Sequence, residues 1–254
     1  MQLRHTQRLF IEAALSTGQT VTLGAEHAHY LQHVLRMKPG GDVRLFNAHD
    51  GEWRGIVAKM LKRSAEIQLR ERLRSPAPGP DLWLCCAPIK KAHFEYMIEK
   101  ATELGVSAIQ PLLTARTQVR DVNAERCRAI AVEAAEQSDR LGIPEIRKPV
   151  KLDSLAVPAA PPARTYIVCA EWGDAAPIEK TLATLRVQKP AKAAIITGPE
   201  GGFAAEELEL MRKMPNAHFV RLGPRILRAD TAAIAALSCW QAVCGDWSQR
   251  TDDR

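Results

Sequence analysis

The sequence lacks several features that would assign it to a specialised class. Its 254 residues contain no run approaching the roughly 18 consecutive apolar residues of a membrane span. The first residues, Met1–His5, lack the apolar stretch of a signal peptide, so we expect a cytoplasmic protein. A hydrophobic share of 46% and a charged share of 25% are typical of globular chains, not of disordered or fibrous ones.

Cysteine is scarce and irregularly placed. The six cysteines show neither the paired two-residue spacing of a zinc site nor the dense framework of a secreted domain: Cys85, Cys86, Cys127, Cys169, Cys239 and Cys244. We therefore expect reduced, mostly buried thiols. His29 and His33 lie one helical turn apart, but no carboxylate or thiol motif completes a ligand set, so we predict no metal site.

Positive charge is concentrated at one end of the chain. Residues 1–74 hold 12 Lys and Arg against 7 Asp and Glu, whereas residues 75–254 hold 23 against 22. A small basic module beside a nearly neutral larger one is typical of a nucleic-acid-binding domain attached to a catalytic domain. A solvated cationic face explains the charge equally well.

A proline-rich segment divides the chain. Ser75–Pro80 contains three prolines and a glycine, which exclude a helix and disfavour a central strand. We predict one domain at 1–74, a linker at 75–81 and a second domain at 82–254. In the first, Asp42–Phe46 and Trp53–Val57 flank a turn and predict a hairpin, and Ala25–Leu35 has helical spacing, so we expect a small β-barrel with one short helix.

The second part of the chain alternates strands with helices. Apolar strands are predicted at Leu82–Ala87, Val106–Leu113, Thr165–Ala170, Ala193–Thr197 and His218–Leu222. Helices are predicted at Lys91–Leu104 and near 123–139, 176–187, 205–213 and 232–243. Such alternation predicts an α/β fold with a mainly parallel sheet covered by helices.

A glycine-containing loop follows one of these strands. The segment Thr197–Phe203 leaves the strand and enters a helix, at the sheet edge where open α/β sheets bind ligands. It matches neither phosphate-binding fingerprint, and Glu206 and Glu207 in the next helical turn would repel a phosphate. This disfavours ATP and weakens the case for NAD. S-adenosylmethionine, with adenosine, a sulfonium and no phosphate, suits the loop better; a tight turn without a ligand is the alternative.

A second loop, Leu222–Thr231, also follows a strand. Gly223 and Pro224 predict a rigid turn, and Asp230 or Thr231 is expected to cap a helix that starts near Ala232. Arg225 and Arg228 could bring positive charge to the same rim. Taken alone, two arginines in a loop are more often surface charge than catalysts.

Together these loops resemble a known family. Thr197–Gly202 followed by Leu222–Arg228 is similar to the signature pair of the RsmE family, which comprises methyltransferases of the SPOUT superfamily that act on N3 of a uridine in 16S ribosomal RNA. The similarity extends to His33–Met37, Lys100–Val106 and Glu133–Ser138. One departure is Ala229–Asp230 where the family usually has Thr-Glu, which puts any contact of the longer carboxylate in doubt.

The resemblance implies more than the pattern alone. It implies a PUA-like RNA-binding barrel, a SPOUT domain tied in a deep trefoil knot, a homodimer, and 16S rRNA or the small ribosomal subunit as partner. The alternation of elements by itself predicts an unknotted sheet. The residues expected to hold S-adenosylmethionine are Thr197, Gly198, Pro199, Glu200, Gly201, Gly202, Leu222, Gly223, Ile226, Leu227 and Thr231. On the basic first domain, Arg8, Arg36, Lys38 and Arg54 are candidate RNA contacts, and a solvated surface charge explains each of them equally well.

Methylation at N3 requires loss of a proton from the uracil ring. Arg228, and secondarily Arg225, is the candidate for stabilising negative charge on the uracil carbonyl oxygens. No strong candidate for a base emerges: Glu200 and Glu136 are weak ones, and solvent is the alternative. Two alternatives remain open: an RNA-binding or ribosome-assembly factor without methyl transfer, and a nicotinamide-dependent oxidoreductase, which the missing Gly-x-Gly-x-x-Gly disfavours.

Overall fold

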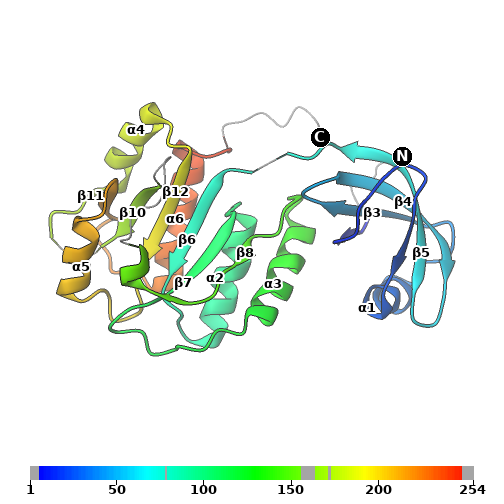
Figure 1. Ribbon diagram of the computed structural model, residues 1–254, viewed down its shortest axis with the longest axis horizontal. Coiled ribbons are helices and arrows are strands. Elements are labelled where there is room, and N and C mark those ends of the chain that lie inside the picture. The colour runs from blue at the N-terminus through cyan, green and yellow to red at the C-terminus, as the bar shows by residue number, and fades with distance from the viewer. Residues whose placement is uncertain (1–5, 78, 156–163, 171–172, 248–254) are drawn as a thin grey trace. The chain divides into compact units, whose positions relative to one another are not determined.

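The computed structural model describes residues 6–77, 79–155, 164–170 and 173–247 and divides into two compact units (Figure 1). One unit runs to residue 77 and also takes in residues 135–142. The other unit contains the remainder of the described chain. The proline-rich segment thus lies where the chain passes from one unit to the other, and Pro78 within it is outside the described residues.

The first unit is built on a five-stranded sheet in the order β1-β3-β4-β5-β2. Its strands are β1 (Arg8–Phe10), β2 (Thr20–Leu23), β3 (Asp42–Asn47), β4 (Gly51–Met60) and β5 (Ala65–Arg74). The pair β1 and β3 is parallel, and the other pairs are antiparallel. The predicted hairpin is confirmed by the β3–β4 register, in which Leu45 faces Trp53.

One helical segment covers the core of this sheet. Helix α1 (Ala25–His29) continues directly into a π-helical turn, Tyr30–Val34, which confirms the helix predicted at Ala25–Leu35. Ala28 and Leu31 are buried against alternate strand residues such as Val43 and Ile67, because successive strand side chains point to opposite faces. Arg36, just after this turn, adopts a positive φ of 52°.

The second unit contains a larger sheet whose strand pairs are all parallel. Its order is β11-β13-β10-β12-β6-β7-β8, with β9 also paired to β7. The strands are β6 (Asp81–Cys86), β7 (Ala108–Leu113), β8 (Glu145–Ile146), β9 (Val150–Lys151), β10 (Thr165–Cys169), β11 (Ala176–Pro177), β12 (Lys192–Thr197) and β13 (Ala217–Arg221). The predicted α/β class with a mainly parallel sheet is confirmed.

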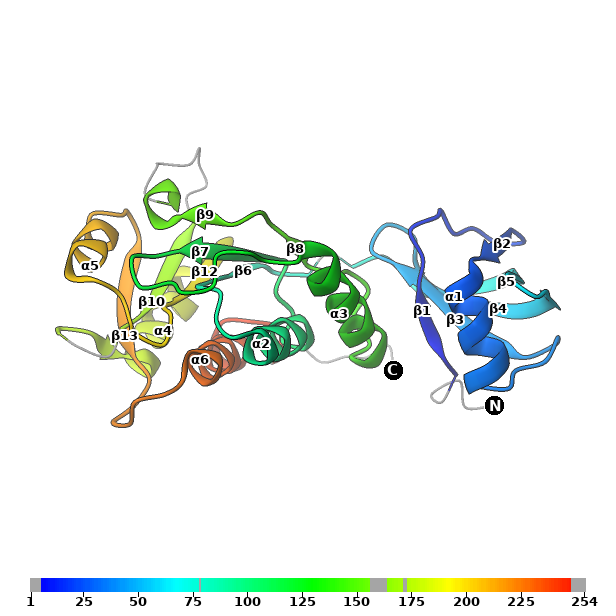
Figure 2. The same cartoon turned by 90° about the horizontal axis from the view of Figure 1, so that it is seen from below.

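Helices cover both faces of this sheet. They are α2 (Lys91–Glu103), α3 (Ala124–Gln137), α4 (Ile178–Gln188), α5 (Ala205–Arg212) and α6 (Ala229–Val243). Leu82 and Leu84 of β6 pack in one core cluster with residues of α2, α3, α4 and α6. Cys85 points the other way, into a cluster that includes Met211 of α5. Figure 2 shows α2 and α6 together on one side of the sheet.

The sequence analysis did not predict the shortest strands and turns of the second unit. Strands β8, β9 and β11 have two residues each, and a 3-10 turn covers Leu152–Leu155, too short for a periodic signal. The trefoil knot implied by the family resemblance stays a prediction. None of the helices in the described segments is both long and apolar enough to span a bilayer.

Candidate functional site

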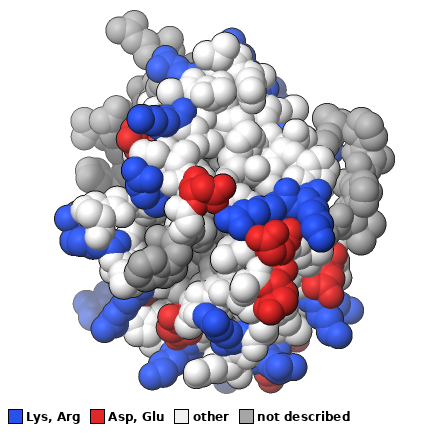
Figure 3. All heavy atoms as spheres, turned by 90° about the vertical axis from the view of Figure 1, so that its left-hand side faces the viewer, with Lys and Arg blue, Asp and Glu red and all other residues white. Residues whose placement is uncertain are grey.

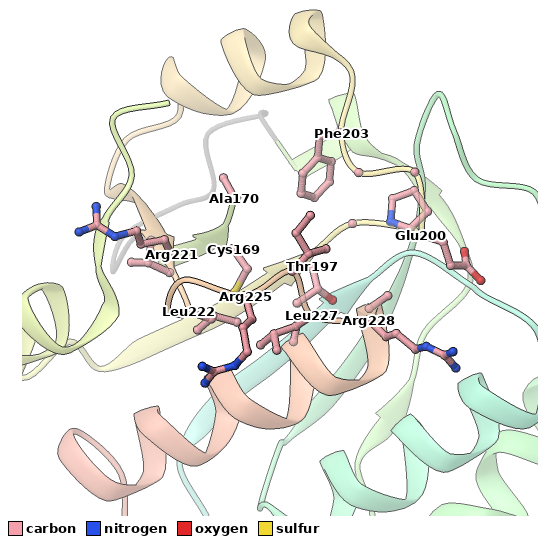
Figure 4. A pocket seen from close by; sticks show the side chains of 18 of the residues that line it. Cys169, Ala170, Thr197, Glu200, Phe203, Arg221, Leu222, Arg225, Leu227 and Arg228 are labelled. Atoms are coloured by element: carbon pink, nitrogen blue, oxygen red, sulfur yellow. The ribbon is translucent and has the colours of Figure 1, made fainter. Parts of the chain in front are cut away.

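The two loops singled out in the sequence line one cavity. The cavity has a volume of about 610 Å³, within the usual range for small-molecule sites. The glycine loop follows β12 and the arginine loop follows β13, and β10 lies between these strands in the sheet. Parallel strands direct their carboxyl ends to the same edge, which brings the loops together (Figure 4). The lining residues include Thr197–Phe203, Leu222–Ala229, Arg116, Cys169 and Ala170.

Of the predicted donor-binding residues, all but one line this cavity. Thr197, Gly198, Pro199, Glu200, Gly201, Gly202, Leu222, Gly223, Ile226 and Leu227 line it, together with Arg225 and Arg228. Thr231 is exposed and does not belong to the lining. Ile226, although it lines the cavity, keeps 74% of its surface exposed.

The glycines of the first loop have distinct local roles. Gly202 has a φ of +67°, and its N–H donates to the Pro199 carbonyl oxygen (2.9 Å), which closes a tight turn. A Cβ on Gly198 would lie 3.2 Å from the ring of Phe203, which packs over the loop. The loop is therefore compact and exposes main-chain atoms to the cavity.

The turn after β7 supports this loop, and sequence reasoning missed it. The Arg116 guanidinium donates to the carbonyl oxygen of Gly201 (2.6 Å). The carboxylate of Glu207 accepts from the N–H of Ala115 (2.7 Å) and from that of Ala204 (2.8 Å). Glu207 therefore links the start of α5 to the turn, a role beyond the dipole effect expected from sequence. The available signal was the position of Arg116 after a strand of the same sheet.

The same turn is held by two buried threonines. Thr117 Oγ1 accepts from the N–H of Thr114 (2.9 Å) and lies 2.8 Å from Thr114 Oγ1. Both residues are buried. This side-chain turn fixes the backbone on which Arg116 is placed.

The arginines of the second loop point in different directions. Gly223 has a φ of +108°, which supports the sharp turn after β13. Figure 4 shows the side chains of Arg225 and Arg228 directed to opposite sides of the loop. Both line the same cavity, and their side chains extend from the loop in different directions.

The start of α6 differs from the prediction. The helix begins at Ala229, with Arg228 as N-cap and no capping side-chain hydrogen bond, so the predicted start near Ala232 and the predicted caps are wrong. Instead, Asp230 Oδ2 lies 2.8 Å from Nδ1 of His93 in α2, and Asp230 Oδ1 accepts from the N–H of Thr231 (2.8 Å). Burial opposes ionisation, but the hydrogen bonds from His93 and Thr231 outweigh it and lower the pKa of the Asp230 carboxyl.

The hydroxyl oxygen of Thr197 is the one polar side-chain atom of the site that is buried without a hydrogen-bond partner among the described residues. The whole residue is 2% exposed. Such an unpartnered group is costly unless a ligand or water satisfies it. Cys169 lies close by in the lining, but burial raises the pKa of its thiol to about 12, so it is a neutral wall of the cavity and not a nucleophile.

The charge of the lining suggests two kinds of ligand. Four arginines and one glutamate line the cavity: Arg116, Arg221, Arg225, Arg228 and Glu200. Arg221 donates to the Ala175 carbonyl oxygen (2.9 Å) and is directed away from the cavity centre in Figure 4. The lining therefore combines main-chain and apolar atoms of the two loops, which suit the expected donor, with arginine side chains, which suit an anion.

The four expected RNA contacts have different surroundings. Arg36 and Lys38 are exposed, and Arg54 pairs with Asp42 (2.7 Å) and Glu71 (3.4 Å). Arg8 is 3% exposed. Arg8 is therefore inaccessible to RNA, and its expected role as an RNA contact is wrong.

Arg8 instead belongs to a buried ionic cluster of the first unit. Its guanidinium donates to Glu52 (3.1 Å) and to the carbonyl oxygens of Ala135 (2.8 Å) and Arg140 (2.9 Å). Arg44 and Arg74 also contact Glu52, at 3.1 and 3.2 Å. The sequence did not reveal that Arg8 is buried, because its hydrogen-bond partners lie 44 or more residues away.

Surface charge elsewhere is mixed. On the end of the second unit that carries α4 and α5, Figure 3 shows Lys and Arg interspersed with Asp and Glu and separated by uncharged surface. His29 and His33 have ring centroids 4.7 Å apart, and the described residues contain no cluster of three His, Cys, Asp or Glu suited to a metal ion.

Each of the two units matches a known protein-family model. Residues 23–70 match the RNA methyltransferase PUA domain, and residues 76–241 match the RNA methyltransferase domain. The helix-capped sheet of the first unit and the cavity-bearing sheet of the second therefore each correspond to a known domain.

Individual relatives cover nearly the whole chain. A protein of Rickettsia conorii named ribosomal RNA small subunit methyltransferase E is 35% identical over 91% of this chain and 93% of its own length. A crystal structure of the protein of that name from Neisseria gonorrhoeae, bound to S-adenosyl methionine, is 26% identical with a TM-score of 0.82 and covers 96% of this chain and 100% of that one. A putative methyltransferase from Legionella pneumophila, in complex with the same cofactor, is 32% identical with a TM-score of 0.80 over 94% of this chain and 98% of that one. The chain thus belongs to the RNA methyltransferase family, and within it to the ribosomal RNA small subunit methyltransferases E.

Proposed function

We propose that this protein transfers a methyl group from S-adenosylmethionine to N3 of a uridine in 16S ribosomal RNA. The observation that carries the proposal is the cavity formed by both signature loops, with a buried, unpartnered Thr197 hydroxyl in its wall. Its relatives from Neisseria gonorrhoeae and Legionella pneumophila bind S-adenosylmethionine, which supports the choice of donor.

The residues of the cavity fit this donor. Thr197 offers a hydroxyl, and the turn at Gly201 and Gly202 offers main-chain atoms without side chains in the way. Leu222, Ile226 and Leu227 supply apolar surface from the second loop. The donor, when bound, supplies an electrophilic methyl group, and the chain's part is to orient it toward the acceptor.

Arg228 is the proposed catalytic residue, with Arg225 second. A guanidinium at the rim can stabilise negative charge on the uracil carbonyl oxygens after the N3 proton leaves. The two side chains diverge in Figure 4, so we assign this role to one of them, Arg228, and a backbone phosphate contact to Arg225. The Glu136 carboxylate already accepts a hydrogen bond from the N–H of Phe10 (2.9 Å). We therefore propose that solvent or Glu200, and not Glu136, removes the N3 proton.

The remaining assignments concern partners. Exposed Arg36 and Lys38, and half-buried Arg54, are proposed RNA contacts of the PUA domain. The family resemblance supports a homodimer and action on the small ribosomal subunit in the cytoplasm.

The decisive experiment is nucleoside mass spectrometry of 16S rRNA from cells with and without the gene. We expect 3-methyluridine to disappear without it, to return with the wild-type gene and to reach only a small fraction of the wild-type level with Arg228→Ala. Calorimetry should show that Arg228→Ala still binds the donor. An unchanged level of 3-methyluridine in the deletion strain contradicts the proposal, and RNA binding without turnover would favour an assembly factor.

A further inference from the structure

A contact between two helices lies next to the proposed catalytic arginine. His93 is in the first turn of α2 and Asp230 in the first turn of α6, and their side chains meet at 2.8 Å. The His93 side chain is 44% exposed and that of Asp230 only 12%. A carboxylate that is mostly buried is stabilised by a hydrogen-bond partner. His93 is that partner, although it lies 137 residues away in the sequence.

Arg228 depends on its backbone for its position. It is the N-cap of α6, with an extended backbone, and no hydrogen bond or ion pair holds its guanidinium among the residues described. Asp230 follows two residues later. Whatever fixes the first turn of α6 therefore also fixes the point from which the Arg228 side chain extends.

The contact lies where the two helices pack together. Phe94 of α2 and Ala229 and Ala233 of α6 share one buried core cluster. The His93–Asp230 contact adds a directional bond at the end of that apolar interface. Apolar packing alone is non-directional and leaves the rotation of a helix end less defined.

We propose that His93 is a positioning residue for methyl transfer, which holds the start of α6 through Asp230 and so keeps the Arg228 guanidinium at the cavity. This inference rests on the proposed function. It assigns a role to the departure at position 230, where the shorter Asp makes a defined contact with α2.

The test compares His93→Ala, His93→Gln and Lys91→Ala. Gln retains an N–H that can donate to Asp230, and Lys91 is a matched control because it lies in the same turn with an 86% exposed side chain. We expect His93→Ala to lower kcat by about 10- to 100-fold, as displacement of a catalytic group does. KM for RNA and Kd for S-adenosylmethionine should stay within about twofold. His93→Gln should recover most of kcat, and Lys91→Ala should match the wild type.

A second comparison separates positioning from general loss of stability. In an Arg228→Ala background, His93→Ala should cause no further fall in kcat, because the residue that it positions is gone. An equal fall in both backgrounds, or an unchanged kcat in His93→Ala alone, overturns the proposal.

A readout independent of activity completes the test. Nitrogen NMR of the His93 ring should show hydrogen-bonded Nδ1–H, and a ring protonated at Nε2 alone overturns the proposal. A wild-type protein that methylates no RNA removes the proposed function and this role with it. An intact NMR signal in that case would show that the failure lies in the function and not in the contact.

Discussion

The guanidinium of Arg116 donates to the carbonyl oxygen of Gly201, 85 residues further along the chain. This bond joins the turn after β7 to the glycine loop after β12. The loop that is expected to hold the methyl donor is therefore held by a strand end that the signature motifs do not include.

Removing this bond should weaken donor binding. We expect Arg116→Ala to raise Kd for S-adenosylmethionine about fivefold, because a hydrogen bond of this kind contributes about 1 kcal/mol. Arg120→Ala is the control, since it removes an exposed arginine from the segment that follows. Isothermal calorimetry measures both, and equal affinities in the two variants would exclude the supporting role.

Removing the Thr197 hydroxyl should maintain or raise the stability of the free protein but lower its affinity for the donor. Thr197→Val removes a buried hydroxyl that has no partner, so the free protein should be as stable as the wild type or more stable by up to about 1 kcal/mol. Donor affinity should fall about fivefold if the hydroxyl bonds the donor. Urea denaturation and calorimetry provide the two values. A variant with unchanged affinity would show that the hydroxyl does not bond the donor.

Glu52 should be critical for the stability of the first unit. It is fully buried and contacts Arg8, Arg44 and Arg74, and burial lowers the pKa of the Arg8 guanidinium against the opposing effect of Glu52. We expect Glu52→Gln to reduce the free energy of unfolding by about 3 kcal/mol, because it leaves buried positive charge unpaired.

The matched control for Glu52 is Glu71→Gln. Glu71 also pairs with an arginine, Arg54, but its side chain is 60% exposed. We expect a loss of no more than about 0.5 kcal/mol. Denaturant titrations of both variants measure the difference, and similar losses would refute the importance of burial.

Asp230 should make stability depend on pH in the acid range. Its pKa is lowered in the folded protein, so its contribution is present above the unfolded value of about 3.9 and is lost as the pH falls through the folded value. We expect the difference in unfolding free energy between wild type and Asp230→Asn to shrink as the pH is lowered through this window. Asp153→Asn, at an exposed site, should show a smaller change. A difference that is constant with pH would contradict this.

Local patterns predicted most of the regular structure. Helix α2 and strands β6 and β12 begin and end within one or two residues of expectation, because apolar periodicity and a following glycine or loop define them. The start of α6 was misplaced because Asp230, a typical cap, bonds to His93 on another helix. Arg116 was missed and Arg8 was misjudged for the same reason: their partners are distant in sequence, and charge alone does not reveal them.

The acceptors of Arg8 have a practical implication for protein production. The carbonyl oxygens of Ala135, Glu136 and Arg140 accept from its guanidinium and lie in residues 135–142, which belong to the first unit although they follow the proline-rich segment by more than fifty positions. A gene fragment that stops at that segment would encode the PUA domain with the buried Arg8 guanidinium deprived of those acceptors. Recombinant versions of the module therefore need the later peptide, supplied as a fusion or in trans.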